Sequence, residues 1–227
     1  MATFPAQDAA MDTTFSTPAP FALNTDPRCL FSAAARTGTD VITAIRPDQL
    51  DNPTPCPDFD VRGLLGHLVG VVRRIGAMGR GENPMAVDIE LPDVADDAWP
   101  ATWLAAVEAA TAAWTDDAAL ARTVVLPWAT DTGAAALLGY VSEVTVHTWD
   151  IAQATGQHPA WDDDTVGHAL DLMRSWLPGE GRAEIFAVVR DQMGMDPSTP
   201  DAFAAVVRVP DDAPLIDRLV AWNGRRP

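Results

Sequence analysis

The sequence has 227 residues, enough for one substantial domain, and 48% of them are hydrophobic, so a packed core is expected. All 15 basic residues are arginine, and against 32 acidic residues they leave a net charge of −17, which disfavours nucleic acid and anionic membranes as partners. No apolar run approaches the roughly 20 residues of a membrane-spanning helix. Two cysteines, Cys29 and Cys56, are too few for a disulfide scaffold, so we expect a cytoplasmic protein with reduced thiols.

The first elements of the chain are a leader and one helix. Residues 1–25 are rich in Pro, Thr and Ala and lack the basic and apolar blocks of a signal peptide, which predicts a flexible leader. Residues 26–227 are then expected to form the domain. Leu30, Ala34, Val41 and Ile45 recur with helical spacing until Pro47 ends the pattern.

A second helix is predicted to begin after Asp60. The stretch DNPTPCPDFD (51–60) holds three prolines, which exclude a helix there, and Asp60 is a good N-cap. The following residues, VRGLLGHLVGVVRRIGAMG (61–79), place their large aliphatic side chains on one stripe. The pattern predicts a helix packed into a core, with His67 at the edge of the stripe.

The remaining chain predicts four more helices and little β structure. Helices are expected over about 99–116, from Thr132 to Ala154, and from the acidic cluster at 162–165 to just before Pro178. Strand-like patches lie at 123–128 and 203–210, and a final short helix covers about 213–222. These elements predict a mainly all-α fold: a four-helix bundle with a short β element and a C-terminal helix.

A possible site lies on the fourth predicted helix. Glu143 and His147 are four residues apart and therefore share one face, at the edge of the apolar stripe, with Tyr140 adjacent. With His67 from a facing helix, they would match the three protein ligands of a catalytic zinc site. A Glu–His pair at this spacing also occurs on many helices as a simple hydrogen-bonded pair, and the three could form a buried cluster without metal.

Three long motifs add a family resemblance. TPCPDFDVRGLLGHLVG (54–70) and LPWATDTGAAALLGYVSEVTVHTWDIAQATGQ (126–157) resemble the actinobacterial DinB-like family. Within it they are most similar to the branch that contains the metal-binding domain of mycothiol-dependent maleylpyruvate isomerase. The tail VRVPDDAPLIDRLVAWNGR (207–225) resembles the end of small single-domain members. The resemblance implies a DinB-like four-helix bundle that binds a divalent metal, most often zinc, through His67, Glu143 and His147.

The resemblance also implies a chemistry. In this family a low-molecular-weight thiol such as mycothiol approaches the metal, which stabilises the thiolate over the thiol. The expected function is S-transfer to, or cis–trans isomerisation of, a small electrophilic substrate by a monomer or homodimer. Two alternatives stay open: a non-catalytic metal-binding or stress protein, and a specialised biosynthetic enzyme that uses metal-activated hydrolysis or addition.

Further residues are candidates for roles around such a site. Arg74, on the same helical line as His67, and Arg218, in the last helix, are candidates for contacts to an anionic substrate. Asp150 is a candidate for orienting His147 from outside the set of ligands. The alternative for Arg74 and Arg218 is a plain surface residue, and the alternative for Asp150 is a hydrogen bond to a neighbouring helix or to a backbone group.

Overall fold

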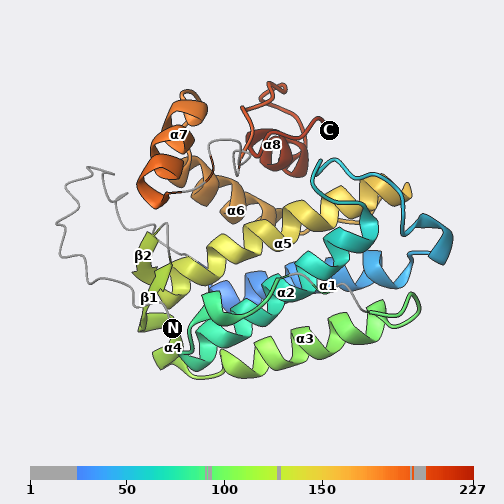
Figure 1. The fold of residues 1–227 in the computed structure, drawn as a ribbon, viewed down its shortest axis with the longest axis horizontal. Helices are drawn as coiled ribbons and strands as arrows, with labels where there is room; N and C mark the ends of the chain where they lie inside the picture. The colour runs from blue at the N-terminus through green and yellow to red at the C-terminus, as the bar shows by residue number, and fades with distance from the viewer. Residues whose placement is uncertain (1–24, 90, 92–93, 127–128, 195, 197–202) are drawn as a thin grey trace.

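Four helices form the body of the protein in the computed structural model, which describes residues 25–89, 91, 94–126, 129–194, 196 and 203–227. They are α1 (Pro27–Thr43), α2 (Val61–Arg80), α3 (Trp99–Ala113) and α5 (Gly133–Thr155). Helix α1 packs against α5 and α3, and α2 packs against the same two helices, so the four close into a bundle (Figure 1). The predicted all-α, DinB-like bundle is confirmed, whereas the leader predicted over 1–25 falls almost entirely outside the described residues.

The ends of these helices follow from their capping residues. The side chains of Asp26, Asp60 and Thr132 accept hydrogen bonds from first-turn backbone N–H groups of α1, α2 and α5. Gly81 and Gly156 end α2 and α5 in the left-handed conformation, with φ of 76° and 69°. Because these signals are local, the predicted bounds of α2 and α5 agree with the structure to within one residue.

The core lies between the four helices. The aliphatic stripe predicted for α2 is fully buried, and the large side chains of Trp103 and Trp114 fill the space beside it. Each indole N–H finds an acceptor: Trp103 donates to Oγ1 of Thr39 at 2.9 Å and Trp114 donates to the carbonyl of Ile75 at 2.8 Å. The core therefore leaves neither of these indole N–H groups without a partner.

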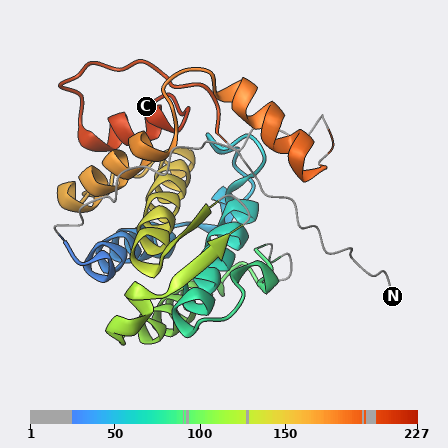
Figure 2. The same ribbon diagram turned by 90° about the vertical axis from the view of Figure 1, so that its left-hand side faces the viewer.

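A short hairpin leads into α5. Strand β1 (Thr123–Leu126) pairs antiparallel with β2 (Ala129–Thr132), with Thr123 opposite Thr132 (Figure 2). The strand predicted at 123–128 is confirmed over 123–126, where it forms one arm of a hairpin with β2. The third predicted helix ends early, at Ala113, and Asp116 caps a separate short helix, α4 (Asp117–Ala121). Two 3-10 turns, Pro47–Gln49 and Pro84–Ala86, complete the connections among the described residues.

The C-terminal elements pack on the outer side of α5. Helix α6 (Asp163–Trp176) contacts both α5 and α8 (Leu215–Trp222), and α7 (Arg182–Met193) follows α6 in the chain (Figure 1). Val146 and Trp149 of α5 join the apolar residues of α6 and α8 in a second core cluster. Helix α5 is thus packed on two sides. No described helix is long and apolar enough to cross a lipid bilayer.

One predicted element is wrong, and one helix was not predicted. The strand predicted at 203–210 is wrong: its described backbone is irregular, and the N–H of Val207 donates to the carbonyl of Ala221 at 2.9 Å instead of to a strand. Helix α7 was not predicted, although Gly181 and Gly194, both with positive φ, bound it. The β-rich composition of 203–210 has no described strand beside it to pair with, so packing against α8 determines its path.

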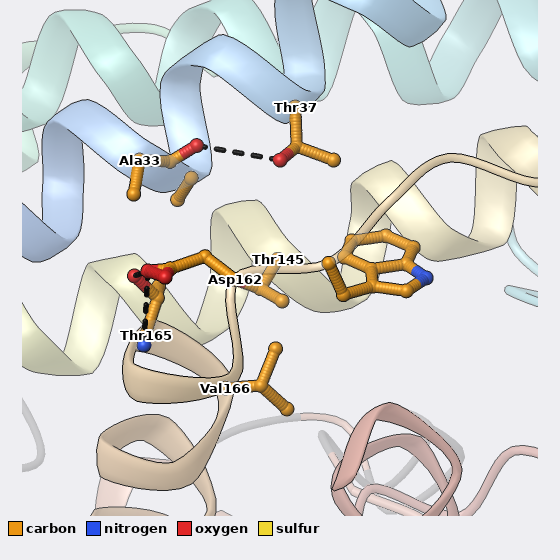
Figure 3. A pocket seen from close by; sticks show the side chains of 8 residues that line it. Ala33, Thr37, Thr145, Asp162, Thr165 and Val166 are labelled. Atoms are coloured by element: carbon orange, nitrogen blue, oxygen red, sulfur yellow. Dashed lines mark hydrogen bonds between the residues drawn. The ribbon is translucent and has the colours of Figure 1, made fainter. Parts of the chain in front are cut away.

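A small cavity of about 10 Å³ lies between α1, α5 and the start of α6 (Figure 3). Its volume is about that of one water molecule. The three threonine hydroxyls around it are already paired: Thr37 with the carbonyl of Ala33, Thr145 with that of Val141, and Thr165 with Asp162. The cavity is therefore a gap in the packing and not a substrate site.

Candidate metal centre

His67, Glu143 and His147 come together between α2 and α5. One ligand atom from each of the three side chains lies within 4.8 Å of the other two. Nε2 of His67 is 3.2 Å from Oε1 of Glu143, and the two imidazole rings meet edge to face with centroids 5.0 Å apart. Two imidazoles and one carboxylate are a donor set that suits a divalent metal such as zinc. The described residues thus fit the metal that the family resemblance implies.

The fold positions these side chains through two neighbouring helices. Glu143 and His147 lie one turn apart on α5, and His67 faces them from α2, with the ring of Phe59 stacked on it at 5.2 Å. On α2, Gly70 allows the backbone at Ile89 to pass very close, because a Cβ on residue 70 would lie 2.4 Å from Cα of Ile89. The segment before α3 therefore lies directly on α2, one turn from His67.

The carboxyl group of Glu143 is ionised at neutral pH. Burial alone would raise its pKa, but the hydrogen bond with His67 and the electrostatic effect of the neighbouring His147, His67 and Arg74 side chains outweigh that effect and lower the pKa below its usual value. The side chain of Glu143 keeps 35% of its surface exposed, against 12% for each histidine. The cluster can therefore be reached from solvent on the side of Glu143.

Asp150 contacts His147 from the same helix. Its carboxylate, which is fully buried, lies 3.1 Å from Nδ1 of His147, so Nδ1–H can donate to it and leave the lone pair of Nε2 for a metal. Cys56, His147 and Asp150 form a second group with metal-ligand atoms close together. In this second group, Asp150 already forms an ion pair with Arg225. The positive charge of that guanidinium disfavours a cation there.

Tyr140 and Arg74 lie beside the three residues. The hydroxyl of Tyr140 is buried and has no hydrogen-bond partner among the described residues. Burial and then the charge of Glu143 raise the pKa of Tyr140 to about 12, against the opposing effect of Arg74. Nε of Arg74 donates to the carbonyl of Val87 at 3.3 Å. Arg218, by contrast, lies on α8 and forms no hydrogen bond or ion pair with the cluster in the described part of the chain.

The phenol of Tyr140 is expected to ionise near pH 12 in the folded, metal-free protein instead of near pH 10. A raised pKa favours the protonated phenol in the folded state, so this contribution to stability is present below about pH 10 and lost as the pH rises toward 12. Tyr140 is the only tyrosine in the sequence, so ultraviolet difference spectroscopy reports it directly. The denatured chain is the control and should titrate near pH 10. A folded protein that titrates there too would contradict the described burial.

One contact beside the cluster could not be predicted from the sequence. Arg225, which follows α8, forms an ion pair at 3.1 Å with Asp150, 75 residues away in the chain. Its neighbours Asn223 and Gly224 are a helix-ending signal, but nothing in the local sequence points to Asp150. Arg225 and Asp150 are brought together only because the end of α8 packs against α5.

The sequence is similar to a known protein family and to two bacterial proteins. The family described as the mycothiol maleylpyruvate isomerase N-terminal domain matches residues 31–152, which include all three clustered residues. Two proteins of Mycobacterium tuberculosis, uncharacterized protein MT0763 of strain CDC 1551 / Oshkosh and uncharacterized protein Rv0738 of strain ATCC 25618 / H37Rv, are each 26% identical over 200 residues. Those alignments cover 88% of this chain and 98% of each relative.

A solved structure shares the fold. The crystal structure of the mycothiol-dependent maleylpyruvate isomerase superposes with a TM-score of 0.50 at 12% identity. The superposition covers 65% of this chain and 66% of that one, just under two thirds of its length. Similarity at this level of identity concerns the fold and not the reaction.

Proposed function

The chain belongs to the mycothiol maleylpyruvate isomerase N-terminal domain family, and from that premise we propose that it is a metal-dependent enzyme that uses a thiol of the mycothiol type. Its reaction is S-transfer to, or cis–trans isomerisation of, a small electrophilic substrate. The observation that carries the proposal is the convergence of ligand atoms from His67, Glu143 and His147 within 4.8 Å, with the carboxylate of Glu143 partly exposed to solvent.

The proposed metal is zinc, held by those three side chains. Three protein ligands would leave a further coordination position, as in catalytic zinc sites, and a divalent cation held by them would supply the charge that favours thiolate over thiol near neutral pH. The residues of the chain contribute the rest. Glu143 brings a full negative charge, because its pKa is lowered, and Asp150 holds His147 with Nε2 free.

Arg74 and Tyr140 are proposed to bind the electrophile. Arginine suits a carboxylate of the substrate, and Tyr140 stays a neutral hydrogen-bond donor at physiological pH because its pKa is raised to about 12. Its hydroxyl is buried without a partner, which is a cost unless a bound molecule accepts its hydrogen bond. In S-transfer the thiolate sulfur forms a bond to the electrophilic carbon while the π bond of an unsaturated acid, or a C–O bond of an epoxide, breaks and the electron pair released takes up a proton from solvent. In isomerisation that addition is reversed after rotation about the former double bond.

Consumption of the electrophile is expected to require both the thiol and the metal. The purified protein is stripped of metal with a chelator, reloaded with zinc, and assayed with and without thiol on a panel of unsaturated acids and epoxides. We expect turnover only when both are present, because the thiol is the nucleophile and the metal raises its thiolate fraction. Equal rates without thiol would contradict the proposal, and stoichiometric metal binding without turnover of any substrate would favour a non-catalytic metal-binding protein.

A further inference from the structure

The chain that follows α8 turns back and places Arg225 on α5. Nε of Arg225 lies 3.3 Å from Oδ1 of Asp150, and Nη2 lies 3.1 Å from Oδ2. The side chain of Arg225 is 12% exposed and that of Asp150 is fully buried. The guanidinium therefore meets the carboxylate with two nitrogens on two oxygens, in the fork geometry that makes arginine–carboxylate pairs strong and directional.

A helix-ending motif presets the position of Arg225. The N–H of Gly224 bonds to the carbonyl of Ala221 and that of Arg225 to the carbonyl of Val220, which is the Schellman arrangement at the end of α8. Gly224 has a φ of 82°, and a Cβ there would lie 2.7 Å from Cβ of Ala204. Nη1 of Arg225 donates to the carbonyl of Asn223 at 2.9 Å, so backbone contacts also hold the guanidinium.

Asp150 links this turn to the candidate metal centre. Its Oδ2 atom lies 3.1 Å from Nη2 of Arg225 and 3.1 Å from Nδ1 of His147. Arg225 thus fixes the orientation of the carboxylate and balances its charge inside the protein. A carboxylate fixed in this way selects the His147 tautomer that carries its proton on Nδ1.

We propose that Arg225 is a positioning residue: through Asp150 it sets the tautomer and ring orientation of His147, so that the turn after α8 becomes part of the centre between α2 and α5. The expected effect on metal affinity rests on the proposed function, whereas the expected effect on His147 does not. A buried ion pair with a purely structural role would change stability and leave the ring nitrogens of His147 unchanged.

Nitrogen-15 NMR of the histidine rings tests the proposal in the metal-free protein. In the unaltered protein we expect His147 as the single tautomer protonated on Nδ1. In Arg225→Gln that signature should be lost, whereas Arg226→Gln, which removes the exposed neighbouring arginine, should leave it unchanged. Unchanged His147 shifts in a folded Arg225→Gln protein would overturn the proposal.

Metal titration forms the second arm, with zinc as the probe and a competing chelator. We expect Arg225→Gln to weaken zinc binding about 10–100-fold, the usual loss when a residue outside the ligand set is removed. Arg225→Lys keeps the charge without the fork; it should recover part of the affinity and serves as the test variant if Arg225→Gln does not fold. Wild-type affinity in both Arg225 variants would count against the proposal. If the unaltered protein binds no zinc, the proposed function fails, and the NMR result still decides the role of Arg225.

Discussion

Replacing His147 by alanine is expected to lower the affinity for zinc by more than about 100-fold. Removal of a residue outside the ligand set costs up to about 100-fold, and removal of a ligand should cost more. His147 would supply one of three ligands, and its alanine variant leaves only His67 and Glu143, which cannot complete a three-ligand site. Isothermal titration with zinc, together with metal analysis of the dialysed protein, measures the change. Glu143→Gln, which keeps the shape of the side chain but not its charge, should act in the same direction.

The matched control for this prediction is His158→Ala. His158 is exposed in the loop between α5 and α6. Its removal shows whether the loss of any one histidine, and not of His147 in particular, lowers the affinity for zinc. We expect wild-type affinity and stoichiometry in that variant. A stoichiometric site that persists at wild-type affinity in folded His147→Ala would show that the metal, if bound, is bound elsewhere.

Trp103→Ala is expected to destabilise the metal-free protein by about 3–5 kcal/mol, the usual cost of deleting a large buried aromatic side chain. Trp103 is 0% exposed and packs beside Gly38 of α1, and its indole N–H bonds to Thr39. The substitution therefore opens a cavity between α1 and α3 and removes one partly buried hydrogen bond. Equilibrium unfolding in urea measures the loss.

Leu104→Ala gives the contrast on the same helix. Leu104 follows Trp103 directly but points away from the core and is 48% exposed, so its loss should change the stability by only about 0.5 kcal/mol. Similar losses for the two variants would contradict the described burial of α3. Both variants should keep the zinc affinity of the unaltered protein when folded, because neither residue belongs to the cluster.

The bundle and the pair of helices that carry the candidate centre were predictable because their signals are local. Asp60 and Thr132 cap α2 and α5, and apolar spacing together with Gly156 sets their length, so one turn separates Glu143 from His147 in any helical reading. Periodicity could not decide that His67 faces them. The long motifs around these residues supplied that expectation, and the structure brings the three side chains together.

The parts that were missed depend on contacts between distant segments. Residues 203–210 have strand-like composition, but a strand needs a partner, and this segment lies against α8. The apolar side chains of α7 lack clear helical spacing, so the sequence between its two bounding glycines does not predict a helix. The pairing of Arg225 with Asp150 spans 75 residues and follows from the way α8 ends, which no local pattern encodes.

The separation of His67 from Glu143 has a consequence for folding. Their side chains meet at 3.2 Å although 76 residues separate them in the chain, and the described cysteines, Cys29 and Cys56, are both free thiols. The proposed cation would thus act as a cross-link between α2 and α5, much as a disulfide does elsewhere, but one that forms only when its ligands are deprotonated. The supply of metal in the cell would then affect the folding stability of the bundle as well as the proposed reaction.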